Sequence, residues 1–247
     1  MKLLLDIGNS EIKAAISDNK GVIIHSIKRI RYDKNKIGSA LETLYSDYSD
    51  KKFDAAGISV VDSKLKAPLS DFISDKFCRK IVFADIELNC GLNFRYEKTL
   101  GTDRVAAVIS AYFNYGNFEN ILIVDFGTAT TYSMLTGDTF IGGLITPGIY
   151  LSYDALINNT ALPHVELKAK YNILNSRTED AIRSGILLSA KKSFEGIVDE
   201  YEKQYYGMTV IATGGGSALM KKISDRITIS DDNLVLKGVL QILNYYE

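Results

Sequence analysis

A motif that occurs twice limits how this chain can fold more than any other feature of its sequence. Each copy consists of an apolar run, then Asp, any residue, Gly and a small polar residue. The first copy contains Asp6 and Gly8, and the second contains Asp125 and Gly127. Because the copies lie nearly half of the 247 residues apart, the repeat predicts two similar domains with a site between them.

The residue types of this motif suit the binding of a nucleotide phosphate tail. An apolar run bounded by Gly and polar residues is typical of a buried strand, so each Asp is expected at a strand end. The Gly lets a ligand approach backbone amides, and the polar side chains add donors for phosphate oxygens. The carboxylate can hold magnesium or its waters. One copy alone is more often an ordinary turn, so it is the duplication that favours a nucleotide site.

Composition argues against several classes of partner. Lys and Arg total 29 against 30 for Asp and Glu, so there is no basic excess to attract nucleic acid. No apolar run approaches the roughly 18 residues of a membrane span, and no signal segment precedes the first strand, so we expect a cytoplasmic protein without membrane contacts. With two His residues and no Cys-x-x-Cys pair, a carboxylate is the expected base and oxygen the expected metal ligand.

Periodicity predicts the elements that follow each motif. In the first half we expect strands at 12–16, 22–27, 53–61 and 80–84, and helices at 38–48, 65–77 and 105–115. In the second half we expect strands at 121–125, 130–135, 140–144 and 209–212, and helices at 149–157, 182–201, 217–223 and 234–245. Each half is then a three-stranded meander followed by alternating helices and strands, which implies mixed sheets with helices on their faces in domains 1–117 and 118–247.

Local signals predict how some of these elements begin and end. Ser176 and Glu179 fit a capping box at the start of the long helix. Asp231 or Asp232 can cap the last helix. The segment 146–148, which reads Thr-Pro-Gly, predicts a type II turn.

Two further segments could belong to a phosphoryl-transfer site. Asp103 and Arg104 open an apolar helix, where they could be a base beside an anion-binding guanidinium or only a charge pair at a helix start. Gly214–Gly216 follow a predicted strand and could support adenine or ribose, or could be a plain strand-to-helix connection. The P-loop, the dinucleotide-binding motif and the hydrolase elbow do not occur in the sequence.

Taken in order along the chain, these segments resemble those of the type III pantothenate kinases. The matching segments are Asp6–Ser10, Gly101–Arg104, Asp125–Thr131, Gly142–Gly148, Thr178–Gly185 and Thr213–Gly215. The resemblance implies the α/β fold of actin, the sugar kinases and Hsp70, with two duplicated ribonuclease-H-like domains, mixed β-sheets and an ATP cleft between the domains. It also implies a homodimer that phosphorylates pantothenate with ATP in the first step of coenzyme A synthesis.

The resemblance further implies a role for each matching position. The ATP phosphates would meet Asp6, Ile7, Gly8, Asn9, Ser10, Glu11, Ile12, Lys13 and Thr128, with Mg²⁺ held by Asp6 through water. A monovalent cation, K⁺ or NH₄⁺, would be held at Asp125. Pantothenate would meet Phe94, Gly101, Thr102, Asp103 and Arg104, with Asp103 as the base and with Thr178 reaching the substrate across the dimer interface.

Three positions depart from the usual pattern of that family. Ser10 stands where Thr is common, Phe94 stands where Tyr is usual although Tyr96 is close by, and Ser133 stands where Asp is often found. Two alternative functions are a sugar or amino-sugar kinase of the same fold and a catalytically idle, nucleotide-binding regulatory protein. The scarcity of Cys and His argues against the zinc cluster of many sugar kinases. The presence of all three expected Asp residues argues against the idle protein.

Overall fold

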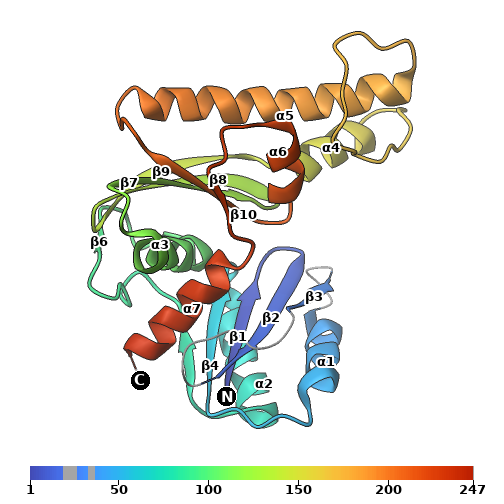
Figure 1. Cartoon of the computed structure of the whole chain (residues 1–247). Coiled ribbons are helices and arrows are strands. Elements are labelled where there is room, and N and C mark those ends of the chain that lie inside the picture. Colours follow the sequence, from blue (N-terminus) through green and yellow to red (C-terminus); the bar gives the residue numbers. More distant parts are fainter. Residues whose placement is uncertain (19–26, 33–36, 247) are drawn as a thin grey trace. The chain divides into compact units, whose positions relative to one another are not determined.

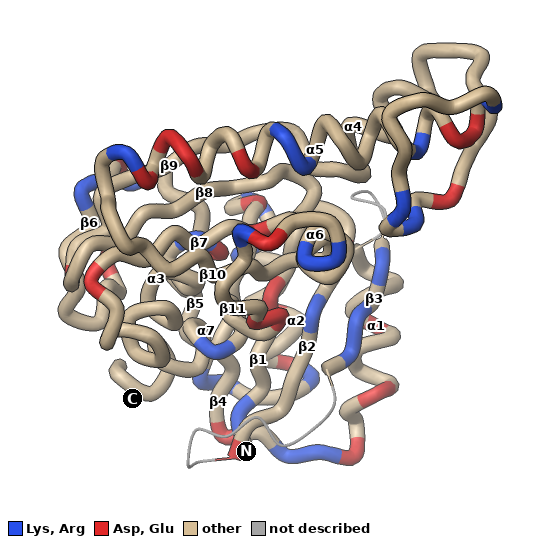
Figure 2. Tube along the Cα trace, turned by 45° about the horizontal axis from the view of Figure 1, so that its top comes forward, with Lys and Arg blue, Asp and Glu red and all other residues tan. Residues whose placement is uncertain are grey.

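The computed structural model describes residues 1–18, 27–32 and 37–246, and the chain divides into two compact units (Figure 1). Unit 1 comprises Met1–Gly116, Asp138–Phe140 and Asn233–Glu247. Unit 2 comprises Asn117–Gly137 and Ile141–Asp232. The last helix therefore belongs with unit 1, whereas the division at residue 117 had assigned it to the second half of the chain. Residues of both charge signs are interspersed along both units (Figure 2).

Unit 1 is built on a five-stranded mixed sheet with the order β3-β2-β1-β4-β5. The strands are β1 (Lys2–Ile7), β2 (Glu11–Ser17), β3 (Lys28–Arg31), β4 (Ala55–Val60) and β5 (Ile81–Phe83). β1 pairs antiparallel with β2 and parallel with β4. Because this central strand is covered on both faces, Leu3, Leu4 and Leu5 are all fully buried, which explains the continuous apolar run in the sequence.

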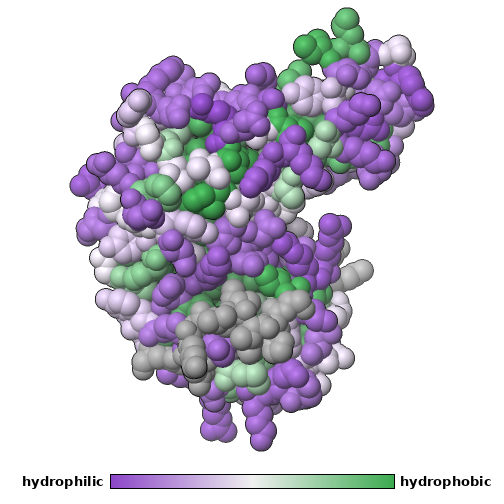
Figure 3. Space-filling model, viewed as in Figure 1, coloured by the Kyte–Doolittle hydropathy of each residue, from purple (hydrophilic) through white to green (hydrophobic). Residues whose placement is uncertain are grey.

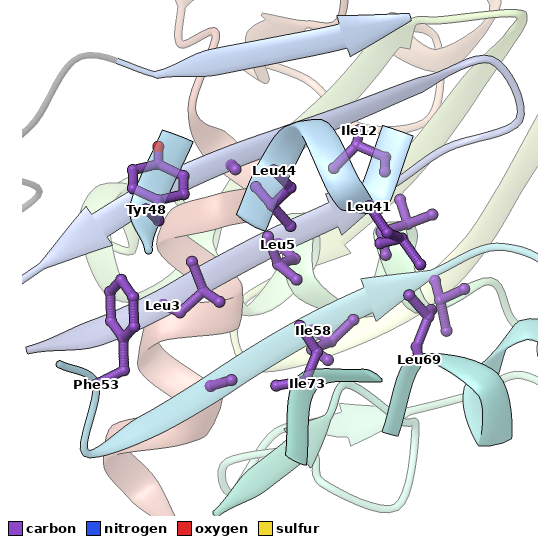
Figure 4. Close-up of a cluster of buried hydrophobic side chains, with 14 of the residues drawn as sticks. Leu3, Leu5, Ile12, Leu41, Leu44, Tyr48, Phe53, Ile58, Leu69 and Ile73 are labelled. Carbon is purple, nitrogen blue, oxygen red and sulfur yellow. The ribbon is translucent and has the colours of Figure 1, made fainter. Parts of the chain in front are cut away.

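Helices cover both faces of this sheet. They are α1 (Ile37–Tyr48), the short 3₁₀ turn η2 (Ser63–Leu65), α2 (Lys66–Lys76), α3 (Thr102–Tyr115) and α7 (Leu234–Tyr245). On one face, Leu44 of α1 and Ile73 of α2 pack with Leu5 and Ile58 of the sheet (Figure 4). On the other face, α7 lies so close to β4 that a Cβ at Gly57 would come within 2.7 Å of Val239. α3 packs against α7.

Unit 2 contains a six-stranded sheet with the order β11-β10-β7-β8-β9-β6. The elements are β7 (Asn120–Phe126), β8 (Ala129–Thr136), β9 (Thr139–Pro147), α4 (Ile149–Asn158), α5 (Thr178–Glu202), β10 (Thr209–Thr213), α6 (Ser217–Ile223) and β11 (Ile229–Ser230). The edge strand β6 (Asn93–Phe94) pairs only with Thr139 and Phe140, which belong with it in unit 1. Phe194 and Leu187 of α5 pack with Phe126 and Tyr132 in the core of unit 2.

The two sheets repeat one topology. The order β3-β2-β1-β4-β5 of unit 1 corresponds to β9-β8-β7-β10-β11 of unit 2, and β7 is again antiparallel to β8 and parallel to β10. The registers match as well, since Asp6 lies opposite Ser59 and Asp125 lies opposite Thr213. The prediction of an α/β protein with two mixed sheets is confirmed.

Two predicted segments differ from the structure. The strand expected at 22–27 lies almost entirely outside the described residues, and the third strand is formed by Lys28–Arg31, which had been assigned to a charged connection. A charged strand is stable there because it is an edge strand, and Arg29 forms an ion pair with Glu11 across it at 3.0 Å. The type II turn expected at 146–148 is not formed, because β9 extends through Pro147 and Gly148, with a φ of −72°, is the N-cap of α4. Proline is tolerated there because β6, the neighbour of β9 on one side, pairs with it at Thr139 and Phe140 and does not reach Pro147.

The predicted helix caps are wrong. α5 begins at Thr178 after Arg177, with no hydrogen bond from a capping side chain, so Ser176 does not form the capping box. α7 begins after Asn233, again without a side-chain cap. Asp232 instead accepts a hydrogen bond from Ser217 at 2.8 Å and so joins the end of the β11 segment to α6.

Candidate active site

Asp6 lies at the end of β1, on a strand enclosed by β2 and β4. Its partner on β2 is Lys13, and its partner on β4 is Ser59, whose hydroxyl donates a hydrogen bond to the carboxylate. The pKa of Asp6 is raised to about 7, mainly by burial and then by the charge of Asp103, while the charge of Lys13 and the hydrogen bond from Ser59 act in the opposite direction. The carboxyl group of Asp6 is therefore poised between its two protonation states near neutral pH.

Asp103 lies in the first turn of α3, directly after the N-cap residue Gly101 and Thr102. Its Oδ1 accepts a hydrogen bond from the amide of Arg104 at 2.8 Å. Burial raises the pKa of Asp103, and this amide and the charge of Arg104 oppose the rise. A Cβ at position 101 would come within 2.5 Å of the same Oδ1. Because Gly101 has no Cβ, the carboxyl group of Asp103 can lie against the start of the helix.

The hydroxyl of Thr102 fixes the start of α3 to the end of β4. Thr102 Oγ1 accepts a hydrogen bond from the amide of Val60 at 2.8 Å and donates one to the carbonyl of the same residue at 2.9 Å. It also lies 3.2 Å from Ser59 Oγ. Asp103, the next residue along the helix, is thereby held beside Asp6, which accounts for the effect of its charge on the pKa of Asp6.

Arg104 is buried among aromatic rings. Its guanidinium lies 5.4 Å from the ring centre of Tyr96 and 5.5 Å from that of Phe140, within the range of cation–π attraction. Phe94 packs on Phe140 with a ring separation of 5.6 Å. Two residues expected at the site, Phe94 and Arg104, are therefore brought together around Phe140. Sequence reasoning missed Phe140, because nothing in a strand pattern connects it with a helix 36 positions earlier.

The first motif forms a tight loop between β1 and β2. The amide of Gly8 donates to the carbonyl of Glu11 at 3.0 Å, which closes the turn. Tyr32 fixes it from outside, since its hydroxyl donates to the carbonyl of Gly8 at 2.5 Å and its amide donates to the carbonyl of Ser10 at 3.0 Å. Asn9 and Ser10 lie at the surface of this loop. Tyr32 is a second supporting residue that sequence reasoning missed.

The second motif forms a loop that two glycine-containing turns support. The amide of Gly148 donates to the carbonyl of Thr128 at 3.1 Å, and the amide of Gly216 donates to the carbonyl of Phe126 at 2.8 Å. Gly214 has a φ of +86°, and a Cβ there would collide with Asp125 Oδ1 and with the main chain of Phe126. The triple glycine therefore packs directly on the Asp125 loop, a contact that its sequence alone did not predict.

Three other positions complete the map of expected site residues. Thr128 is exposed at the tip of its loop, and Thr178 is exposed in the first turn of α5. Ser133 is buried on β8, two residues beyond the partner of Asp125 in the antiparallel pair. In the described part of the chain, no cluster of three or more His, Cys, Asp or Glu side chains is arranged to hold a metal ion. None of the helices described has the length and apolar character to cross a membrane.

The sequence profile of type III pantothenate kinase matches residues 2–200 of the chain. The type III pantothenate kinase of Fusobacterium nucleatum is 32% identical over 95% of this chain and 95% of its own length. The chain belongs to the type III pantothenate kinase family. The member from Brevibacillus brevis is 32% identical over 97% of this chain and 96% of its own length, and the member from Flavobacterium johnsoniae is 28% identical over 99% and 98%.

Solved structures agree with this assignment at the level of the fold. A ROK family glucokinase from Streptomyces griseus, in complex with glucose and AMPPNP, aligns with a TM-score of 0.58 at 14% identity and covers 96% of this chain and 97% of its own. The activator of 2-hydroxyisocaproyl-CoA dehydratase from Clostridium difficile, with bound ADPNP, aligns with a TM-score of 0.58 at 16% identity and covers 99% and 93%. The fold of this family member is therefore that of the actin and sugar kinase type of ATPase.

Proposed function

We propose that this protein transfers the γ-phosphoryl group of ATP to the primary hydroxyl of pantothenate, giving 4'-phosphopantothenate in the first step of coenzyme A biosynthesis. The observation that carries the proposal is the pair Asp6 and Asp103, two acidic groups held side by side by different elements in a chain of the pantothenate kinase family. Both reactants are soluble metabolites, which suits a cytoplasmic enzyme.

Asp103 is the proposed general base. An alcohol becomes a useful nucleophile only as its proton leaves, and a positioned carboxylate near the operating pH assists that step by roughly a hundred- to ten-thousand-fold. Burial raises the pKa of Asp103, so its carboxylate is a stronger base than an exposed one. Neither His25 nor His164 lies in the sequence segments that contain Asp6, Asp103 and Asp125.

The loop from Asp6 to Lys13 is the proposed phosphate-binding segment, with Thr128 as a phosphate ligand from the second loop. Asp6 fits magnesium, because a divalent cation would relieve the repulsion that the charge of Asp103 now exerts on it. Few protein ligands are needed, since Mg²⁺ keeps several waters and binds phosphate oxygens directly. When bound, magnesium neutralises charge on the phosphates. Lys13 would keep Asp6 oriented, because the two face each other across β1 and β2.

Asp125 is the proposed ligand of a monovalent cation, K⁺ or NH₄⁺. Its Oδ1 is buried against the main chain at Gly214, where a side chain would fill the space. The carbonyl oxygens of Gly127 and Thr128 both face Gly148 close by, so the loop gathers the neutral and charged oxygen atoms that such a cation prefers. Ser133, which lies on the adjacent strand, supplies a hydroxyl in place of the carboxylate often found there.

Gly101–Arg104 and Phe94 form the proposed acceptor site. The guanidinium of Arg104 can pair with the carboxylate of pantothenate, and the rings of Tyr96 and Phe140 hold it in position.

We further propose a homodimer in which Thr178 of one copy reaches the acceptor of the other. Unit 2 exposes apolar side chains that a partner could cover: Leu144, Ile145, Tyr150, Leu151, Ile173 and Leu174. Part of this apolar surface is seen in Figure 3.

An ADP-release assay with Mg²⁺ and K⁺ tests the proposed reaction. Pantothenate, glucose, N-acetylmannosamine and no acceptor are compared at equal ATP, and the phosphorylated product is identified by mass spectrometry. Pantothenate alone is expected to stimulate ADP release. Stimulation by a sugar would make the protein a sugar kinase, and ATP binding without turnover on any acceptor would make it a regulatory relative.

A further inference from the structure

Two buried hydroxyl groups connect the two acidic residues of unit 1. Ser59 donates a hydrogen bond to Asp6, and its Oγ lies 3.2 Å from Thr102 Oγ1. Thr102 in turn holds both the amide and the carbonyl of Val60, at 2.8 and 2.9 Å. Ser59 and Thr102 are almost completely shielded from solvent, with exposed fractions of 0% and 9%. A continuous series of contacts therefore leads from Asp6 through Ser59 and Thr102 to the first turn of α3, which carries Asp103.

This chain of contacts does more than stabilise the start of a helix. In the first helical turn, the side chain of Thr102 bonds to β4, the guanidinium of Arg104 lies against Tyr96 and Phe140, and Gly101 provides no side-chain cap. The hydroxyl of Thr102 therefore joins the start of α3, next to Asp103, directly to the strand beside Asp6. A displacement of about 1 Å in a catalytic group can lower turnover a hundredfold, so such a connection matters for chemistry as well as for folding.

The internal repeat gives independent support for Ser59. The residue opposite Asp125 on the parallel strand of unit 2 is Thr213, so a buried hydroxyl side chain lies beside the Asp of both motifs. The repeat keeps this hydroxyl although the flanking residues differ between β4 and β10. Among the described contacts, only the hydroxyl of unit 1, that of Ser59, lies against a helix that carries a second acidic residue.

We propose that Ser59 and Thr102 are positioning residues for the kinase reaction: their hydroxyl groups, with the peptide of Val60, hold the base Asp103 at a fixed place beside Asp6. The inference rests on the proposed function for its effect on turnover. It also assigns the hydroxyl of Thr102 to the protein interior, so that within the proposed acceptor site pantothenate would meet the backbone of Thr102 and not its hydroxyl. Loss of this hydroxyl should then lower kcat and leave substrate affinity nearly unchanged.

The test compares Thr102→Val, which removes the hydroxyl, with Thr102→Ser, which keeps it. Thr102→Val should lower kcat by about 10- to 100-fold, and Thr102→Ser should restore it close to wild type. Ser110→Ala is the matched control, because Ser110 is a fully buried hydroxyl on the same helix that contacts only Asn114 among the described bonds. It should leave kcat unchanged.

Combination with Asp103→Asn separates positioning from direct substrate contact. If Thr102 acts through Asp103, adding Thr102→Val to Asp103→Asn should produce no further loss of kcat and no tenfold loss of pantothenate affinity by calorimetry. A further loss of either would overturn the proposal. Ser59→Ala removes the hydroxyl that contacts both Asp6 and Thr102, and it should lower kcat in the wild-type background but not in the Asp103→Asn background. This variant replaces Thr102→Val in the test if Thr102→Val fails to fold.

Hydrogen exchange supplies a readout that does not depend on activity. The amide of Val60 donates to Thr102 Oγ1, so its exchange should accelerate in Thr102→Val and stay unchanged in Ser110→Ala. Faster exchange at Val60 with a normal kcat would show that the contact is structural only, which would overturn the positioning role. If the wild-type protein does not phosphorylate pantothenate at all, the proposed function fails, and the exchange result still decides whether the contact exists.

Discussion

The negative charge of Asp103, at the start of α3, raises the pKa of Asp6, at the end of β1. Two acidic residues 97 positions apart in the sequence therefore share one electrostatic environment. Both residues are half-buried, and this burial raises the pKa of each. Like charges held this close disfavour the ionised form of Asp6, so a cation bound beside it would favour that form.

Asp103→Asn should reduce turnover at least about a hundredfold, because the amide cannot accept the proton of the acceptor alcohol. Asn keeps the oxygen that accepts the Arg104 amide, so the helix start and ATP affinity should be retained. Turnover is measured by ADP release and ATP binding by calorimetry. Near-normal turnover in this variant would mean that Asp103 is only a charge at a helix start.

The stability of the protein without ligands should fall as the pH rises from about 4 to about 7. The pKa of Asp6 is about 7 in the folded chain against an ordinary value of 3.8, so the folded state binds more protons in this interval and loses stability as they leave. One such proton gives a slope of at most about 1.4 kcal/mol per pH unit. Urea denaturation between pH 4 and pH 8 measures the slope. Asp6→Asn should remove most of it, and Asp103, whose pKa is also raised, should account for the remainder.

Gly214→Ala should destabilise unit 2 and reduce activity. Its φ of +86° is unfavourable for alanine, and the new Cβ would collide with Asp125 Oδ1 and the main chain of Phe126. We expect a loss of about 1–3 kcal/mol, seen as a lower melting temperature. Gly215→Ala is the control, since a Cβ there meets nothing within 4 Å. Equal melting temperatures for the two variants would contradict the close packing of Gly214 on the Asp125 loop.

Activity should fall when K⁺ is replaced by Na⁺ at constant ionic strength, if Asp125 holds a monovalent cation. Asp125→Asn should raise the K⁺ concentration needed for half-maximal rate, because it removes the charge that binds the cation. Initial rates over a K⁺ titration measure both effects. Equal rates in the two salts would exclude a K⁺-selective site, and Ser133→Asp would then test whether the missing carboxylate is responsible.

Thr178→Ala should weaken pantothenate binding more than ATP binding, because Thr178 is proposed to reach the acceptor of a partner copy. Light scattering should show a dimer for both the wild type and the variant, since one exposed hydroxyl group contributes little to an interface. An active monomer would refute the shared site. Thr160→Ala, which removes another hydroxyl from unit 2 outside the proposed site, serves as the control for a nonspecific effect.

The repeated motif predicted the folded architecture correctly because both copies obey the same local rules. Each apolar run is a central strand, each Gly follows the strand end, and the Asp residues occupy matching registers opposite Ser59 and Thr213. Strong periodicity located most helices within a few residues, since amphipathic faces depend only on neighbours along the chain.

What the sequence did not predict depends on contacts between distant segments. Tyr32 fixes the first loop and Phe140 supports Arg104, yet in the sequence Tyr32 belongs to a charged connection and Phe140 to an ordinary strand. The cap expected at Asp232 failed because that side chain accepts a tertiary hydrogen bond from Ser217, and the cap expected at Ser176 failed because Arg177 is the N-cap residue of α5. The roles of the other site residues, from Asn9 to Thr178, remain predictions from the family resemblance.

The place of α7 has a consequence for the order in which the protein can be made. α7 is the last helix of the chain, yet it packs against α3 and β4, and Gly238 lies so close to Ala106 that a Cβ would collide with its main chain. The helix that carries Asp103 therefore lacks its contacts with α7 until residues 234–245 have been synthesised. Domains usually fold in sequence as they leave the ribosome. Unit 2 can complete its core first, because it ends at Asp232. Unit 1 completes its core only after α7 has been synthesised.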